Sequence, residues 1–325
     1  MKALLIDQPG SLDNLRIGEA EPPVAGEGEI LIEVGCVGIN PADWKIIEMG
    51  VPSWTMPKVA GLDAAGTVVD IGAGIKDFSA GDRVVYHGSF ARLGAYGERV
   101  AFPAHVVAKI PDGVTFEQAA GLPTAGYTAF LSIEDRIRPG PDDTILIHGA
   151  AGGVGGFAVQ LARLRGARVI ATCSQANFAF VEKLGADHCI DYRSEDVATR
   201  VKELTGGRGV DAVLNTITPQ TAAEAIPMLA FQGQLACCTG LPKFEPLEPL
   251  PRGICIYDIA LGAAYVRGDL RAQTRMAHYG RAMASLVAEG KIDAMVEEAL
   301  PFDRIIEALR RSKSGHQRGR LVVTL

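Results

Sequence analysis

The sequence lacks three features that would point to common classes of protein: a C-x-x-C pair, a long apolar run and a long basic stretch. Without such a pair among its six cysteines, the chain offers neither a zinc knuckle nor a redox dithiol. No apolar run reaches the roughly 18 residues that a membrane span needs. The net charge of −6 argues against nucleic acid. The apolar part of the N-terminal segment is also too short for a signal peptide. We therefore expect a soluble, cytoplasmic protein with neither a membrane nor a nucleic-acid partner.

Short β-branched runs fill the first third of the chain. They lie at residues 31–39, 66–71 and 82–86, and clusters of glycine, proline and acidic residues separate them. This spacing predicts a compact, barrel-like domain, which we place at residues 1–121. With 325 residues in all, the chain has room for about one further domain.

From about residue 120, strand patterns alternate with helical ones. Strands are expected at 144–148, 168–173, 189–192, 210–215 and 234–238, and helices at 154–164, 176–184, 195–204 and 221–229. The alternation predicts βαβ units, and hence an α/β domain with a doubly wound parallel sheet at residues 122–264. Helical patterns at 270–289 and 303–312 and a strand at 320–324 follow. We expect this tail to pack back on the first domain.

A glycine-rich turn joins the first strand of this second domain to the helix that follows it. Its spacing, Ala150-x-Gly152-x-x-Gly155, is a variant of the dinucleotide-binding fingerprint with alanine at the first position. Gly152 lets the backbone approach a pyrophosphate, and Gly155 lets the helix pack close to the strand. Gly153 and Val154 open the helix, whose free N–H groups and positive end favour an anion. A generic glycine-rich turn is the alternative, but the strand–turn–helix context favours dinucleotide binding.

The end of the second strand bears on the choice between NADH and NADPH. An NAD site usually has a carboxylate there for the ribose hydroxyls, whereas residues 172–177 contain none. Ser174 and Asn177 can instead donate hydrogen bonds to a 2′-phosphate, so we expect NADPH. The alternative is that these polar residues only cap the next helix.

A series of short motifs along the chain is, taken together, specific for one protein family. The motifs are residues 38–43 (GINPAD), 57–66 (PKVAGLDAAG), 81–84 (GDRV), 122–129 (LPTAGYTA), 150–155 (AAGGVG), 160–162 (QLA), 184–187 (LGAD) and 319–322 (GRLV). In this order they resemble the medium-chain dehydrogenases/reductases, and within them the zinc-free quinone oxidoreductase branch, over essentially the whole chain. The resemblance implies a GroES-like β-barrel catalytic domain, completed by residues 265–325, and a Rossmann dinucleotide-binding domain.

The zinc-dependent members of this family hold a catalytic metal with ligands from three segments. The resemblance puts Asn40, Leu62 and Thr124 at these three positions, and none of them is a good zinc ligand. The loop of four cysteines that holds a structural zinc would fall between residues 86 and 100, where no cysteine occurs. The six histidines form no pair at helical spacing. We therefore expect no metal site.

Without zinc, the oxidation of an alcohol loses its Lewis acid. The resemblance then implies hydride transfer from NADPH to a quinone or an α,β-unsaturated carbonyl. We expect Asn40 and Thr124 to donate hydrogen bonds to the developing oxyanion. Asp43 is a third catalytic candidate, as a general acid, although a carboxyl group is normally ionised near pH 7 and a turn cap or an ion pair explains it equally well. Trp44 and Tyr127 are candidates for an aromatic wall, with core packing as the alternative.

The resemblance also implies cofactor contacts outside the glycine-rich turn. The contacts to the nicotinamide, its ribose and carboxamide, and the adenosine phosphate come from Thr128, Asn215, Thr239 and Tyr192. Arg318 matches a basic position that reaches the 2′-phosphate. Many members carry lysine or arginine where this chain has Asn177, and this departure weakens the expected grip on the phosphate and leaves room for NADH.

Two other functions stay open. A protein that binds NADPH with little turnover, as a sensor or a structural protein, would carry the same motifs. So would a reductase of an enoyl thioester. A zinc alcohol dehydrogenase is the least consistent alternative, given the residues at the three ligand positions.

The substrate and the assembly are expected only in outline. The substrate is a small electrophilic molecule, and the loops around residues 48–54, 89–95 and 241–258 would shape its pocket. The resemblance implies a homodimer, with residues 235–238 or 254–266 as the candidate seam.

Overall fold

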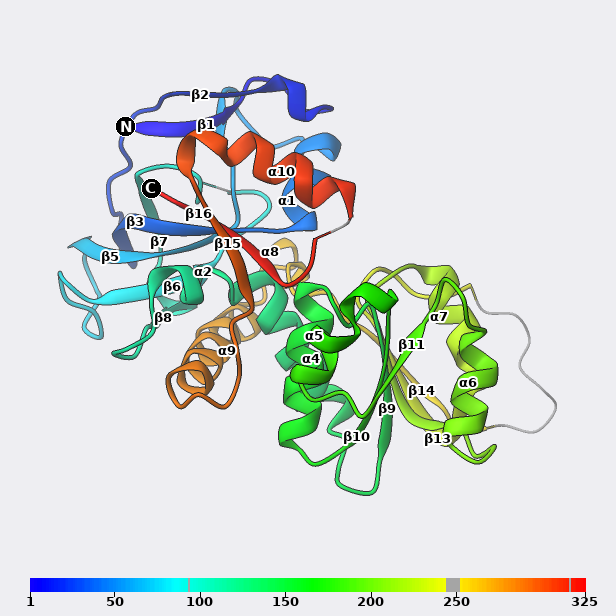
Figure 1. Ribbon diagram of the computed structural model, residues 1–325. Helices are drawn as coiled ribbons and strands as arrows, with labels where there is room; N and C mark the ends of the chain where they lie inside the picture. The colour runs from blue at the N-terminus through cyan, green and yellow to red at the C-terminus, as the bar shows by residue number, and fades with distance from the viewer. Residues whose placement is uncertain (93, 244–251, 316) are drawn as a thin grey trace. The chain divides into compact units, whose positions relative to one another are not determined.

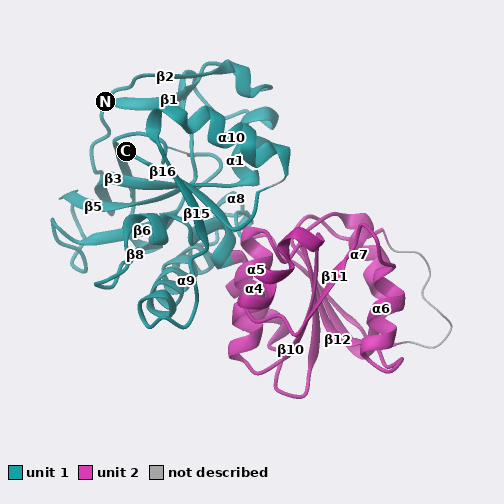
Figure 2. Ribbon diagram, viewed as in Figure 1, with its two compact units in different colours: residues 1–127, 261–325 teal, residues 128–260 magenta. Residues whose placement is uncertain are grey.

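The computed structural model describes residues 1–92, 94–243, 252–315 and 317–325. These residues divide into two compact units, one made of Met1–Tyr127 and Leu261–Leu325 (unit 1) and one of Thr128–Ala260 (unit 2), as Figure 2 shows. The expected boundaries at residues 121/122 and 264/265 differ from these limits by six and four residues.

Unit 1 is built on two β-sheets (Figure 1). The larger sheet has seven strands in the order β15-β16-β3-β5-β6-β8, with β7 also paired to β3, and the smaller has the order β2-β1-β4. The strands are β1 (Lys2–Ile6), β2 (Leu15–Glu19), β3 (Glu29–Ile39), β4 (Lys58–Val59), β5 (Asp63–Ile71), β6 (Arg83–His87), β7 (Arg99–Pro103), β8 (Val107–Lys109), β15 (Val296–Pro301) and β16 (Arg320–Thr324). Their apolar side chains, with those of α1 and α10, form the main core of the unit.

The C-terminal tail completes unit 1, as the sequence predicted. Strand β16 pairs antiparallel with β3, so that Leu321 lies opposite Ile39, and it pairs in parallel with β15. The helices of the unit are α1 (Pro41–Met49), α2 (Phe116–Ala120), α8 (Ala263–Val266), α9 (Leu270–Ala288) and α10 (Ile305–Ser314), with short turns η1 (Leu12–Asn14), η2 (Ala104–Val106), η3 (Pro123–Tyr127) and η7 (Phe302–Arg304). The long helix α9 packs on β8.

Unit 2 holds a six-stranded sheet in the order β11-β10-β9-β12-β13-β14, in which every pairing is parallel. Numbered within the unit this is the order 3-2-1-4-5-6, which is that of a dinucleotide-binding fold. The strands are β9 (Thr144–His148), β10 (Arg168–Cys173), β11 (His188–Asp191), β12 (Val210–Asn215), β13 (Leu229–Cys237) and β14 (Cys255–Asp258). The helices and turns are α3 (Thr128–Phe130), η4 (Leu131–Ile137), α4 (Gly153–Leu164), η5 (Gln175–Asn177), α5 (Phe178–Lys183), α6 (Val197–Leu204), α7 (Pro219–Ala225) and η6 (Ile226–Met228).

Several predicted elements of unit 2 have different limits in the structure. The helix expected to reach residue 229 ends at Ala225, because Pro227 lacks the N–H that a further helical turn requires. Leu229 instead begins strand β13, which is longer than the predicted 234–238. The helix predicted from residue 176 begins with the short turn η5 and becomes α-helical at Phe178.

Part of the expected substrate region lies outside the described residues: positions 244–251 of the 241–258 segment, and position 93 of the 89–95 loop. Among the helices of the described ranges, none combines the length and the apolar character that crossing a bilayer would require.

Candidate active site

The glycine-rich turn of unit 2 links β9 directly to α4. Gly152 caps the N-terminus of α4, and Gly153, Val154 and Gly155 form its first turn. A Cβ atom on Gly155 would lie 2.3 Å from the carbonyl oxygen of Gly149, a contact that no real side chain makes. The helix therefore sits as close to the strand as predicted, and the N–H groups of its first turn lack intrahelical partners.

The neighbouring residues tie this turn to the sheet. The backbone N–H of Ala150 donates to the carbonyl oxygen of Thr172 at 3.1 Å. Gly149 has a φ of +69°, and a Cβ atom there would lie 2.6 Å from Oγ1 of Thr216. The sequence analysis assigned no role to Gly149, although its position just before the fingerprint is a signal for a tight turn.

Polar residues gather where β10 and β11 end. The side-chain N–H of Asn177 donates to Oγ of Ser174 at 3.2 Å, so the two predicted phosphate contacts lie together. Because Cys173 pairs in register with Asp191, Tyr192 follows at the same edge of the sheet. Tyr192 is 55% exposed.

An arginine that the sequence analysis did not consider lies at this same edge. The guanidinium of Arg193 is 5.7 Å from the ring centroid of Tyr192. In the described part of the chain, Arg193 forms no ion pair. Its place directly after the predicted Tyr192 is the signal that would have identified it.

Two further strand ends, those of β12 and β13, carry the other predicted cofactor residues of the sheet, Asn215 and Thr239. Nδ1 of His148 and Oδ1 of Asn215 are 3.3 Å apart, and burial lowers the pKa of His148, so the imidazole is neutral at pH 7. The hydroxyl of Thr216 donates to the carbonyl oxygen of His148 at 2.7 Å. After β13, the buried hydroxyl of Thr239 has no hydrogen-bond partner among the described residues. A buried, unpaired hydroxyl at the carboxyl end of a parallel strand fits a site completed by a ligand.

Two predicted cofactor residues are not part of the sheet of unit 2 or of the turns that follow its strands. Thr128 begins α3, and its carbonyl oxygen accepts a hydrogen bond from Oγ of Ser132 at 2.7 Å. Arg318 belongs to unit 1, where its guanidinium is paired with the carboxylate of Glu297 at 2.5 Å. Their roles rest on the family resemblance.

A buried polar network in unit 1 contains two of the three predicted catalytic residues. Asn40 and Asp63 are both fully buried, and Nδ2 of Asn40 donates to Oδ2 of Asp63 at 2.8 Å. The backbone N–H of Thr124 donates to the same Oδ2 at 2.9 Å, and the Thr124 hydroxyl donates to Oδ1 at 2.8 Å. The hydroxyl hydrogen of Thr124 is thus already used, which corrects the expectation that it is donated to a substrate oxygen.

Arg320 joins this network from β16. Its Nη2 donates to Oδ1 of Asn40 at 2.7 Å, and its Nε donates to the carbonyl oxygen of Gly121 at 2.8 Å. Arg320 is 3% exposed, and burial lowers its pKa below the usual value. The sequence analysis missed both Arg320 and Asp63, although each belongs to a motif that it quoted.

The third catalytic candidate, Asp43, lies beside the network. Its Oδ2 accepts the backbone N–H of Asn40 at 2.8 Å, which is the turn-cap role that was left open. Burial, together with the nearby Asp63 carboxylate, raises the pKa of Asp43 to about 7. Near pH 7 this carboxyl is therefore divided between its neutral and ionised forms, whereas an ionised carboxyl was expected from the sequence. Its Oδ1 is buried and has no hydrogen-bond partner in the described part of the chain.

The aromatic candidates near the network are core residues. Tyr127 is fully buried, and its hydroxyl lies next to α9, 2.5 Å from where a Cβ atom on Gly280 would be. Trp44 packs against the main core of unit 1, with the ammonium group of Lys313 at 5.7 Å from its ring centroid. Core packing is thus the role that both side chains have in unit 1.

The three positions that bear zinc ligands in the metal-dependent relatives carry none here. Leu62 is fully buried, while Asn40 and Thr124 are hydrogen-bonded to Asp63. Within the described ranges, no three histidine, cysteine or acidic residues are grouped closely enough to hold a metal ion.

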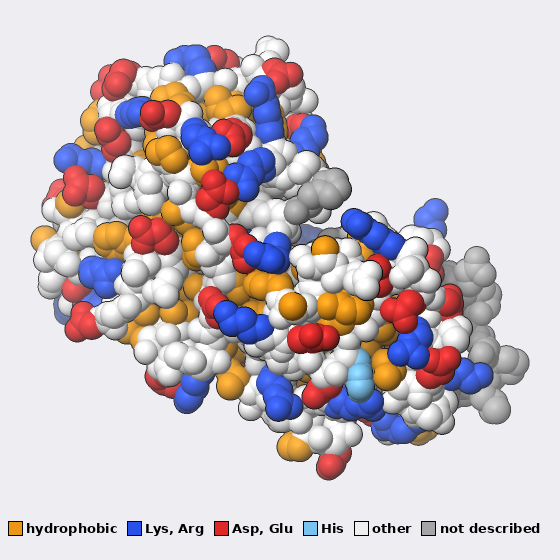
Figure 3. Space-filling model, in the orientation of Figure 1, with side chains coloured by type: hydrophobic (Ala, Val, Ile, Leu, Met, Phe, Trp, Pro, Cys, Tyr) orange, Lys and Arg blue, Asp and Glu red, His pale blue; other side chains and the backbone are white. Residues whose placement is uncertain are grey.

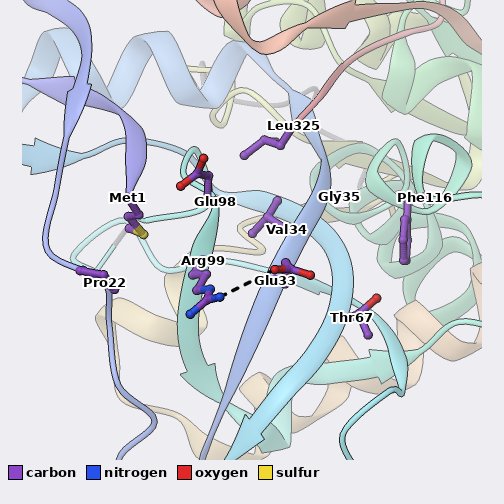
Figure 4. Close-up of a pocket in the computed structure, with 10 residues that line it drawn as sticks. All are labelled: Met1, Pro22, Glu33, Val34, Gly35, Thr67, Glu98, Arg99, Phe116 and Leu325. Carbon is purple, nitrogen blue, oxygen red and sulfur yellow. Dashed lines mark ion pairs between the residues drawn. The ribbon is translucent and has the colours of Figure 1, made fainter.

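Unit 1 also has an open cavity of about 580 Å³. Figure 4 shows its lining, which includes the Glu33–Arg99 ion pair at 3.9 Å, Phe116 and the terminal Leu325. None of the residues of the polar network lines it. We therefore do not assign the reaction to this cavity.

Comparison with known proteins agrees with this arrangement. Two family models match the chain: the alcohol dehydrogenase GroES-like domain over residues 26–112 and the zinc-binding dehydrogenase model over residues 153–287. The chain thus has the two domains of a medium-chain dehydrogenase/reductase and belongs to that superfamily.

Individual relatives show to which branch of the superfamily the chain belongs. The chloroplastic quinone-oxidoreductase QR1 of Triphysaria versicolor is 31% identical, over 97% of this chain and 95% of that protein. Quinone oxidoreductase 1 of Escherichia coli K12 is 37% identical over 90% of each chain. The crystal structure of Escherichia coli quinone oxidoreductase complexed with NADPH matches all of both chains with a TM-score of 0.88 at 29% identity. This chain belongs to the quinone oxidoreductase branch.

Proposed function

We propose that this chain is an NADPH-dependent, zinc-independent reductase that transfers hydride to a quinone or an α,β-unsaturated carbonyl. The observation that carries the proposal is the buried network at the former ligand positions, where Asn40 and Thr124 are bonded to Asp63 and Leu62 is apolar. These side chains cannot hold zinc as a Lewis acid. Conjugated acceptors need less polarisation, because their π systems spread the incoming charge.

The residues of unit 2 fit NADPH. The N-terminus of α4, with Ala150, Gly152, Gly153, Val154 and Gly155 around it, offers N–H groups to the pyrophosphate. When bound, NADPH supplies the hydride. The unpaired Thr239 hydroxyl would gain a partner from it. Asn215 and Thr128 would contact the nicotinamide half of the cofactor.

We assign the 2′-phosphate to the edge formed by β10 and β11. Ser174 and Asn177 would donate hydrogen bonds, and Tyr192 would pack against the adenosine. Arg193 supplies the positive charge that many relatives carry at position 177, and Arg318 keeps the phosphate role that the family resemblance implies. This set favours NADPH over NADH because a carboxylate is absent at the end of β10.

We assign the acceptor chemistry to unit 1, which corresponds to the expected catalytic domain of residues 1–121 and 265–325. Asn40 donates a hydrogen bond to the oxygen on which negative charge develops. The carboxyl of Asp43, whose pKa is raised to about 7, is partly protonated at neutral pH and could then supply a proton. Thr124 fixes the Asp63 carboxylate.

We also propose a cytoplasmic homodimer that acts on a small molecule. In the described part of unit 2, β14 is one of the two edge strands of the sheet, with β11 at the other edge, whereas Leu235 lies on the interior strand β13. The seam is therefore the 254–266 stretch and not 235–238, since an edge strand can pair with a second copy. On the face drawn in Figure 3, acidic and basic side chains are interspersed, which does not favour a nucleic-acid partner.

A panel of acceptors tests the proposed activity. We expect NADPH oxidation, followed by its absorbance, with a 1,4-quinone or a 2-alkenal. Turnover confined to a CoA enoyl thioester would establish the enoyl-thioester reductase instead. Tight NADPH binding without turnover of any acceptor would overturn the proposal in favour of a nucleotide sensor or a structural protein.

A further inference from the structure

Four side chains from well-separated segments meet in the buried network of unit 1. Asn40 precedes α1, Asp63 begins β5, Thr124 lies in η3 and Arg320 begins β16. Asn40 is hydrogen-bonded on both sides, to Arg320 at 2.7 Å and to Asp63 at 2.8 Å. All the contacts lie within unit 1, so the arrangement is a property of the barrel itself.

The two partners of Asn40 fix which way its carboxamide faces. A guanidinium group has only donors, and a carboxylate has only acceptors. The oxygen of Asn40 must therefore face Arg320, and its NH₂ group must face Asp63. The usual ambiguity between the oxygen and the nitrogen of a carboxamide does not arise here.

The same reasoning shows which donors remain for a substrate. Oδ1 of Asp63 accepts the only hydrogen of the Thr124 hydroxyl, and Leu62 has no donor at all. The NH₂ group of Asn40 has two hydrogens, and one of them goes to Asp63. Of the side chains at the three former ligand positions, Asn40 alone thus has a hydrogen that Asp63 does not accept, and the Asp43 carboxyl is the other acidic neighbour of that NH₂ group.

We infer that Arg320 is a positioning residue, which holds Asn40 in the orientation that presents its second N–H to the reacting oxygen. This inference rests on the proposed reductase activity. Arg320 also bonds the carbonyl oxygen of Gly121, just before the segment of Thr124. One buried guanidinium thus bonds both the side chain of Asn40 and the backbone just before Thr124.

A double-mutant cycle tests whether Arg320 acts through Asn40. We expect Asn40→Ala to lower kcat about 100-fold, the loss typical for one oxyanion donor, with little change in the Kd of NADPH. Arg320→Met should lower kcat by a similar factor. The double variant should be no more than about threefold slower than Asn40→Ala, because the two residues serve one interaction.

Two further variants keep the test decisive. Arg320→Lys retains the charge but cannot reach both of its acceptors with one ammonium group, so we expect an intermediate kcat. It replaces Arg320→Met in the cycle if that variant does not fold. Arg83→Met is the matched control: Arg83 also donates to a backbone carbonyl, that of Val114, and does not contact Asn40. Its kcat should match that of the unmodified protein.

The outcomes separate the inference from the proposed function. If the unmodified protein binds NADPH but reduces no acceptor, the proposed function fails. If it is active and the losses from Asn40→Ala and Arg320→Met multiply in the double variant, the reductase stands and the positioning role of Arg320 is overturned. A fall in kcat for Arg83→Met as large as that for Arg320→Met would also overturn it.

Discussion

The two units build their polar sites in opposite ways. In unit 2 the phosphate-binding turn consists of consecutive residues, and its shape depends on glycines that leave no space for a side chain. In unit 1 the network joins four segments, and the bonded residues Asn40 and Arg320 are 280 positions apart in the sequence. The first site is a local property of the chain, whereas the second exists only once β16 has paired with β3. A local substitution should therefore damage cofactor binding, and substitutions at distant positions should damage the acceptor chemistry.

The largest effect on cofactor binding is expected at the phosphate-binding turn of unit 2. Gly155→Ala places a methyl group 2.3 Å from the carbonyl oxygen of Gly149, so α4 must move away from β9. We expect the Kd of NADPH, measured by fluorescence titration, to rise about 100-fold, in line with the cost of overpacking and a displaced anion site. Gly140→Ala is the control, because its Cβ atom would meet nothing closer than 3.7 Å. Equal NADPH affinities for the two variants would show that the phosphate site does not depend on the close packing of Gly155.

The next largest effect is a pH dependence of stability that comes from unit 1. The pKa of Asp43 is raised from 3.8 to about 7 in the folded protein. Between these values the folded state binds more protons than the unfolded chain, so this group makes the free energy of unfolding fall as the pH rises, by up to about 1.4 kcal/mol per pH unit. Asp43→Asn removes that titration.

Thermal unfolding of both proteins between pH 4 and 7 measures this difference. The stability of the unmodified protein relative to Asp43→Asn should decline steadily across the range. Burial lowers the pKa of His87, which makes stability rise with pH towards 6.5, but this contribution is common to both proteins and cancels. Parallel curves would show that Asp43 does not hold its proton.

A smaller effect is expected at the edge of β10 and β11. Arg193→Gln removes the exposed cation beside Tyr192 and should raise the Kd of NADPH about tenfold, while that of NADH changes less than about twofold. Arg208→Gln, whose arginine is paired with Asp211, serves as the control. Equal losses for both cofactors would argue against a phosphate contact at Arg193.

The smallest expected effect is an increase in NADPH affinity. Asn177→Lys restores the cation that many relatives carry, at a position already bonded to Ser174. We expect NADPH to bind about threefold more tightly, as for one added exposed charge contact. Unchanged affinity would place the 2′-phosphate elsewhere.

Much of unit 2 could be predicted from the sequence because its signals are local. The strands at 144–148, 168–173 and 210–215 have the predicted limits, as does the last strand of unit 1 at 320–324. Continuous apolar runs bounded by turns suffice to define them. The end of α7 could not be placed by periodicity, because Pro227 interrupts a pattern that otherwise continues.

The network of unit 1 could be predicted only in part. Asn40 and Thr124 were found by their positions relative to the family motifs, but Asp63 and Arg320 carry no local signal of their partners. The raised pKa of Asp43 could not be predicted from the sequence, because the complete burial that causes it is a tertiary property.

Chelation tests the central claim, metal-free reduction, most directly. The protein is treated with a strong chelator, its metal content is measured, and NADPH oxidation with a 1,4-quinone is compared before and after. We predict equal rates, with no response to added zinc. Activity that appears only with an alcohol and NADP, disappears on chelation and returns with zinc would contradict the account.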